Sequence, residues 1–144
     1  MSDRRDTKRR LLETASLVFA GKGYRGATVQ DLCRAAGVNV AAVSYHYGSK
    51  DGLYLAVWKH AEGAFRAAAE RIGAIDDPRL RLAEMIRFRI RHIFDDGLTG
   101  CLRRLVYHEM ADPSKAHGEV FNRFVWPQMK QLTDLVAAVL NTAS

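Results

Sequence analysis

Residues 28–50 combine small, polar and hydrogen-bonding side chains in a pattern suited to contact with nucleic acid. Thr28 and Asp31 predict a helix start with a capping box. The Thr28 side chain can accept a hydrogen bond from a first-turn amide, and Asp31, three residues on, can reach back to Thr28. Gly37 ends this helix, and Asn39 caps a second short one over 40–47. Two short helices joined by a glycine-containing turn are typical of a helix-turn-helix.

A helix-turn-helix binds DNA by placing its second helix in the major groove, so its outer face needs small or polar side chains. Val43 and Tyr47 lie four residues apart and are expected to face the core. The start of the first helix suits phosphate contact, because helix N-termini bind anions. The candidate DNA-binding residues are Thr28, Gln30, Asn39, Val40, Ala42, Ser44, Tyr45, His46 and Lys50. Packing combined with a polar surface is the alternative reading of the same residues.

Positive charge is concentrated beside this region. Residues 1–50 hold nine Lys or Arg against four Asp or Glu, and residues 51–144 hold thirteen against twelve. A basic cluster next to a folded domain suits a polyanion, either nucleic acid or a membrane surface, although a solvated arm has the same composition. The densest cluster is Arg4, Arg5, Lys8, Arg9 and Arg10.

Length and composition fit one ordinary globular chain. The 144 residues are 48% hydrophobic and 26% charged, which is enough apolar material to bury a core. No apolar run is long enough to span a membrane, and no apolar signal region follows Met1, so we expect a cytoplasmic protein. Cys33 and Cys101 are then expected to stay reduced, as small buried hydrophobic side chains.

Apolar residues recur at helical spacing along the whole chain, and no alternating β-branched run predicts a strand. The first helix is predicted over 7–22, with Gly21 and Gly23 ending it and Tyr24 packing back on it. The remaining predicted helices run from Lys50 to Ile72 after a Ser49 cap, from Pro78 after Asp76-Asp77, from Leu102 to Met110, and from Ser114 to Asn141 with a bend at Pro127.

The N-terminal part of the chain resembles the DNA-binding domain of the TetR/AcrR family of bacterial transcriptional regulators. The matching residues are Thr7–Phe19, Gly23-Tyr24, Thr28–Leu32, Ala35–Val38, Val43–Lys50 and Leu53-Tyr54. The resemblance implies an all-α fold, with a three-helix DNA-binding head over 1–50 and a helical ligand-binding body over 51–144. By the same resemblance, the nine candidate residues touch DNA in relatives, and Val40, Ala42 and Ser44 set the base preference.

The resemblance also implies a mechanism and partners. Such proteins are homodimeric repressors that bind a palindromic operator on double-stranded DNA and release it when a small-molecule effector enters the body. The segments Asn39–Gly52 and Arg103–Ser114 resemble the CecR-like subgroup. Relatives usually have two further C-terminal helices that form most of the dimer interface. Because this chain stops at Ser144, we expect it to lack these helices, either as a fragment or as a naturally shortened member. The body is then incomplete, and apolar residues near its end need a partner surface.

Helical bodies hold ligands in mostly apolar pockets with a few polar anchors. The candidate lining residues are Met85, Phe88, His92, Tyr107, Met110, Phe121, Phe124, Trp126 and Met129, although each of them is also a plausible core residue. The arginines at 87, 89, 91, 103 and 104 include possible partners of an anionic ligand, with solvated faces and ion pairs as the alternative.

No metal, cofactor or catalytic centre is predicted. The spacing of His92, His108, Glu109 and His117 is not that of a zinc helix motif, and no paired cysteines support one. No phosphate-binding glycine loop or Gly-x-Ser-x-Gly motif occurs. Two rivals to a DNA-binding regulator therefore stay open: a helical small-molecule-binding or protein-interaction module with an incidental basic arm, and, with less support, an all-α enzyme.

Overall fold

The structure is a computed structural model that describes residues 2–141, without the side chains of residues 2, 3, 64, 98 and 99. Met1 and residues 142–144, the end of the predicted body, lie outside the described residues. All regular elements in this part are helices, which confirms the predicted fold class. They are α1 (Ser2–Gly26), α2 (Val29–Ala36), α3 (Ala41–Tyr47), α4 (Lys50–Gly73), α5 (Pro78–Ile93), α6 (Leu98–Ala111), α7 (His117–Val120), the π-helix η1 (Phe121–Val125) and α8 (Trp126–Asn141). None of the helices described here is long and apolar enough to cross a membrane.

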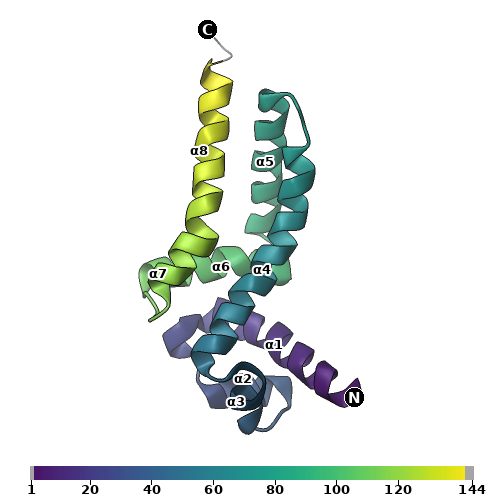
Figure 1. Cartoon of the computed structure of the whole chain (residues 1–144), viewed down its shortest axis with the longest axis vertical. Helices are drawn as coiled ribbons and strands as arrows, with labels where there is room; N and C mark the ends of the chain where they lie inside the picture. Colours follow the sequence, from purple (N-terminus) through teal and green to yellow (C-terminus); the bar gives the residue numbers. More distant parts are fainter. Residues whose placement is uncertain (1, 142–144) are drawn as a thin grey trace.

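The helices form an elongated molecule with a small head and a taller body (Figure 1). The long helix α4 starts in the head, beside α1, α2 and α3, and continues into the body. There α5 runs back alongside α4, α8 stands on the other side of α5, and α6 crosses below them. The buried core is continuous between the two parts, because Phe19 of α1, Tyr54 and Trp58 of α4 and Phe124 of η1 form a chain of ring contacts.

Local capping explains where the head helices begin and end. Thr28 Oγ1 accepts from the Asp31 amide at 3.0 Å and Asp31 Oδ2 accepts from the Thr28 amide at 3.3 Å, which is the predicted capping box. Gly37 ends α2 in the left-handed conformation, with a φ of 62°. The predicted caps Asn39 and Ser49 accept from the amides of Ala41 and Gly52.

The first helix starts earlier than predicted and changes direction at Gly23. Its first turns hold the basic cluster, so these residues lie on a helix and not on an extended arm. Gly23 has a φ of 72° and a ψ of 175°, a conformation almost restricted to glycine, whereas Gly21 stays helical. Tyr24 packs back on Phe19 as predicted, with ring centroids 6.3 Å apart.

Gly23→Ala is expected to lower the free energy of unfolding by about 2 kcal/mol, because the backbone strain of an L-residue at this φ costs about 1–3 kcal/mol. A Cβ at Gly23 would also lie 3.1 Å from His108 Nδ1. Gly21→Ala is the matched control: its Cβ meets nothing within 4 Å, and alanine favours a helix over glycine by about 1 kcal/mol. Urea denaturation of both variants measures the difference, and equal stabilities would contradict this account of the kink.

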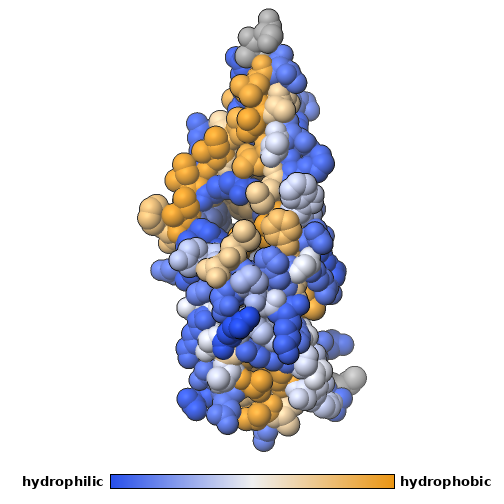
Figure 2. Space-filling model, turned by 90° about the vertical axis from the view of Figure 1, so that its left-hand side faces the viewer, coloured by the Kyte–Doolittle hydropathy of each residue, from blue (hydrophilic) through white to orange (hydrophobic). Residues whose placement is uncertain are grey.

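The predicted last helix is interrupted before Pro127. The chain forms α7, then a π-helical turn at η1, and then α8, with Pro127 in the first turn of α8. Proline has no amide hydrogen and its ring crowds the carbonyl four residues earlier, so a widened turn before it is a usual consequence. The apolar residues near the end of α8 differ in exposure: Leu135 is buried, while Val136 and Leu140 are exposed. Figure 2 shows exposed apolar side chains gathered on the α8 side of the body.

Candidate DNA interface and effector cavity

The outer face of α3 and the loop before it expose most of the predicted DNA-binding residues. Val40, Ser44 and Tyr45 are exposed, with 63% of Tyr45 accessible, and Val43 and Tyr47 face the core as predicted. Asn39, Thr28 and Gln30 are also exposed. Ala42 differs from this group because it is half-buried against the core, while its neighbour Ala41 is exposed.

The basic start of α1 lies beside this face of α3. The Arg4 guanidinium carbon lies 5.6 Å from the centroid of the Tyr45 ring, and Lys8 Nζ lies 5.6 Å from that of Tyr47. Tyr47 Oη donates to the Lys8 carbonyl at 2.9 Å, which ties the two helices together. A shallow head groove lies between them, lined by Thr7, Arg10, Gly37, Val38, Asn39, Ala41, Ala42, Tyr45 and His46. The fold thus brings cations and groove-reading candidates onto one surface.

Lys50 is held more tightly than a surface lysine. It is half-buried, and its Nζ lies 4.2 Å from the centroid of the Tyr24 ring. This burial lowers the pKa of Lys50, which is partly offset by neighbouring Asp51. Tyr24 donates its hydroxyl hydrogen to Asp51, and burial with this contact raises the pKa of Tyr24 to about 12. Lys50 would have to extend away from Tyr24 to reach a phosphate.

The body contains a cavity of about 280 Å³ between four helices. Its wall comes from Phe65 on α4, from α5, from α6 and from Gln128 at the start of α8. Two of the predicted lining residues, Phe88 and His92, are among the nine that form it: Phe65, Phe88, Arg89, His92, Ile93, Leu102, Arg103, Val106 and Gln128. We call this space the body cavity.

The other predicted lining residues lie elsewhere. Phe124 is buried and stacks on Trp58 with centroids 5.8 Å apart, and Met85 is buried, but neither lines the body cavity. Phe121 is half-buried against the main core. Tyr107, Met110, Trp126 and Met129 expose half or more of their surface. Sequence periodicity missed Leu102 and Val106 because a helix has several apolar positions, and only the packing of its neighbours shows which of them face a void.

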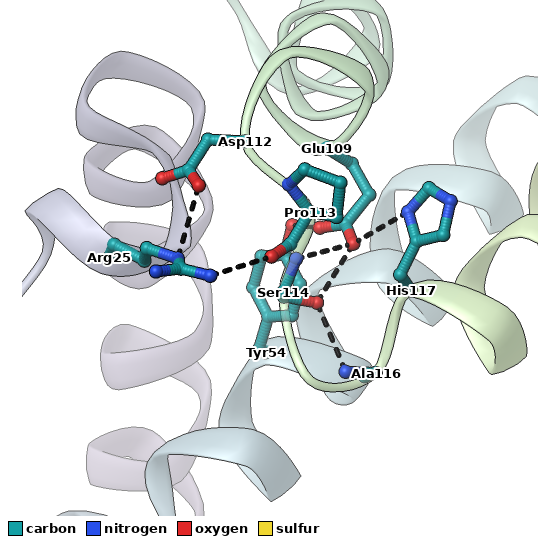
Figure 3. Close-up of polar contacts among 8 residues, drawn as sticks. All are labelled: Arg25, Tyr54, Glu109, Asp112, Pro113, Ser114, Ala116 and His117. Carbon is teal, nitrogen blue, oxygen red and sulfur yellow. Dashed lines mark hydrogen bonds and ion pairs between the residues drawn. The ribbon is translucent and has the colours of Figure 1, made fainter.

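A buried carboxylate anchors the junction between head and body (Figure 3). Glu109 of α6 is 2% exposed. Its Oε2 accepts from Tyr54 Oη at 2.7 Å, and its Oε1 accepts from the Ser114 amide and hydroxyl, each at 2.9 Å. His117 Nδ1 lies 3.2 Å from the same Oε1. Burial and this carboxylate raise the pKa of Tyr54, which keeps its hydroxyl as a donor. One side chain therefore ties α6 to α4 and to the loop before α7.

Helix α1 contacts the other side of the same loop. Arg25 Nε lies 3.1 Å from Asp112 Oδ1, and Arg25 Nη2 donates to the Pro113 carbonyl at 3.4 Å (Figure 3). Gly23 approaches His108 closely, as described above. Helix α6 therefore contacts α1 and α4 through its last turns, while Leu102 and Val106, earlier on the same helix, line the body cavity.

Comparison with known proteins places the chain in a family. A family model described as "Bacterial regulatory proteins, tetR family" matches residues 11–57, which include the helix-turn-helix and the start of α4. Over 96% of its length the chain is 30% identical to the transcriptional dual regulator CecR of Shigella flexneri, of which it covers 67%. The chain belongs to the TetR family. The resemblance seen in the sequence is thereby confirmed.

Solved structures agree with this TetR-family fold. HlyIIR, a hemolysin II transcriptional regulator, matches 97% of the chain with a TM-score of 0.79 and 23% identity, and the match covers 76% of HlyIIR. AibR, solved in complex with isovaleryl coenzyme A and operator DNA, matches 96% with a TM-score of 0.75 and 21% identity, over 72% of AibR. At these identities the likeness concerns the fold alone.

Membership of the TetR family decides between the classes that the sequence left open. The family consists of DNA-binding transcriptional regulators that respond to small molecules, so the chain is a regulator and not an enzyme.

Proposed function

We propose that this protein is a transcriptional repressor that binds a palindromic operator as a homodimer and leaves it when a small molecule fills the body cavity. The observation that carries the proposal is the shared surface of α1 and α3, where Arg4 and Lys8 flank the exposed Tyr45. In this assignment the cations dock on phosphates, and residues 39–46 enter the major groove.

In this proposal the head and the body have different functions. Residues 1–50 form the DNA-binding head and residues 51–144 the ligand-binding and dimerisation body, with the boundary at the start of α4. The exposed apolar residues of α8, among them Trp126, Met129 and Leu140, support contact with a second copy. In a dimer the two α3 helices must lie about 34–36 Å apart, or a multiple of it, to enter successive major grooves. In this assignment the repressor acts in the cytoplasm, where its operator DNA lies.

Helix α6 supplies the connection between effector and operator. It lines the body cavity with Leu102 and Val106, and its Glu109 accepts from Tyr54 of α4. Asp112, directly after α6, pairs with Arg25 of α1 in the head. A ligand that displaces α6 or the Phe65 region of α4 would move the head on its body and change the separation of the two α3 helices. Because that separation must match the helical repeat of DNA, a shift of a few ångströms weakens operator binding.

The direction of regulation is tested in the native host. Chromatin immunoprecipitation of the tagged protein is expected to give discrete sites, and deletion of its gene is expected to raise the adjacent transcripts. A fall in those transcripts would contradict repression and indicate an activator, which is relevant because CecR is named a dual regulator. Uniform occupancy without discrete sites would favour the rival interaction module, whose basic residues bind DNA without regard to sequence.

A further inference from the structure

The body cavity contains a cation that the protein itself does not neutralise. Arg89 of α5 lines the cavity, and its Nε is buried without a hydrogen-bond partner among the described residues. Its guanidinium carbon lies 5.7 Å from the centroid of the Phe65 ring, a favourable contact that supplies no acceptor atom. Burial lowers the pKa of Arg89, but an arginine stays charged inside proteins.

Three other arginines of this region have acidic partners. In the part of the chain that the structure describes, the body cavity has no Asp or Glu in its wall. The three ion pairs are Glu62–Arg66, Glu84–Arg87 and Asp96–Arg104. A buried charge without a partner destabilises a fold, so a position that keeps one is a candidate for binding an opposite charge.

Two more cavity residues complement Arg89. His92 Nδ1 lies 2.6 Å from the Phe88 carbonyl, so this nitrogen carries the hydrogen of that bond, and Nε2 of the neutral ring can accept from a donor group of a ligand. Arg103 is exposed and adds a second positive charge to the wall. The rest of the wall is largely apolar, with Phe65, Phe88 and Leu102. The volume of about 280 Å³ is at the small end of ligand pockets, which run from about 300 to 1,000 Å³.

We propose that the body cavity binds a small carboxylate with an aromatic or aliphatic body, its carboxylate on the Arg89 guanidinium and its apolar part against Phe65 and Phe88. A carboxylate matches the planar fork of a guanidinium and accepts two hydrogen bonds from it. The inference rests on the proposed function, since it names the chemical class of the effector.

The test compares matched ligands by titration calorimetry on the full chain without DNA. The probes are 4-phenylbutyrate, octanoate and indole-3-acetate, each against its neutral amide, with 4-phenylbutylamine as the cation. The carboxylates are expected to bind about tenfold or more tightly than their amides, because a charge-assisted hydrogen bond is lost in the amide. Failure of every carboxylate to bind, equal binding of acid and amide, or preference for the amine would overturn the proposal.

Two variants on α5 test whether Arg89 causes the preference for the acid over the amide. Arg89→Met keeps the length and apolar stem of the side chain and should abolish the preference for acid over amide. Arg87→Met should keep that preference, because Arg87 is exposed and pairs with Glu84. Arg89→Met is also expected to melt at the same or a higher temperature than the unliganded wild type, since it removes the buried Nε that has no hydrogen-bond partner among the described residues. A lower melting temperature together with an unchanged acid preference would assign Arg89 a structural role.

The ligand assay is independent of the DNA assay, so the proposed effector class and the proposed repressor function can be contradicted one without the other. Operator binding with no preference for carboxylates would overturn only the effector class. Carboxylate binding by a protein that recognises no operator would overturn the proposed function and leave the cavity assignment standing.

Discussion

Replacing Tyr45 and His46 together by alanine is expected to lower the affinity for operator DNA about 100-fold. Both side chains face the head groove, where each can donate a hydrogen bond to a phosphate oxygen. A hydrogen bond to a charged group contributes about 1.5–3 kcal/mol, so the loss of two such bonds amounts to about 3 kcal/mol or more. Fluorescence anisotropy with a labelled operator measures the change.

The fold should survive this double substitution. Tyr45 is 63% exposed, and the two rings contact each other with centroids 4.8 Å apart, so little core packing is lost. Circular dichroism should show unchanged helicity. Tyr107→Ala on α6 is the matched control, because Tyr107 is 69% exposed but outside the head groove. Equal affinities of the double variant and the wild type would exclude α3 as the docking helix.

Glu109→Ala is expected to lower the free energy of unfolding by about 3 kcal/mol. The substitution leaves the Tyr54 hydroxyl and the Ser114 amide and hydroxyl without their acceptor. Each donor left unsatisfied in a buried place costs about 1–3 kcal/mol, although a water molecule admitted by the smaller side chain recovers part of this. For a chain of this size the melting temperature should fall by about 6–12 °C, as read by calorimetry.

Asp112→Ala is the control for the junction. Its ion pair with Arg25 joins the end of α6 to α1 at the same junction, but both side chains are more than half exposed. Exposed ion pairs contribute about 0–1 kcal/mol, so this variant should melt close to the wild type. If the two variants lost equal stability, the buried carboxylate would not be the main link between α6 and its neighbours.

Local signals predicted the head well. Three of these signals are the Thr28–Asp31 capping box, the Gly37 stop and the Ser49 cap. Each depends on residues within a few positions of one another, so it can be recognised in the sequence without knowledge of the tertiary fold. The same holds for Asp77 and Pro78 at the start of α5, where Asp77 accepts from the Arg79 amide at 2.8 Å. The two cysteines are free and buried, as expected.

Tertiary packing limited the prediction of the body. Phe88 and Phe124 have the same apolar character in the sequence, yet one lines a cavity and the other fills the core against Trp58. Glu109 looks like a surface residue of α6, and its burial depends on Tyr54, 55 positions away in the sequence. The sequence singled out the arginines at 87, 89, 91, 103 and 104 only as a group. The fold shows that Arg87 pairs with Glu84 and that Arg89 Nε is buried without a hydrogen-bond partner among the described residues.

The central claim is that this chain reads a specific palindrome, and selection of DNA from a random duplex pool tests it most directly. The protein should enrich an inverted repeat whose half-sites are centred about one or two helical turns apart. The Tyr45→Ala/His46→Ala variant, selected in parallel, should enrich the repeat far less. Bulk binding that is lost steeply with salt, without an enriched sequence, would contradict the account and leave only a helical protein with a basic surface.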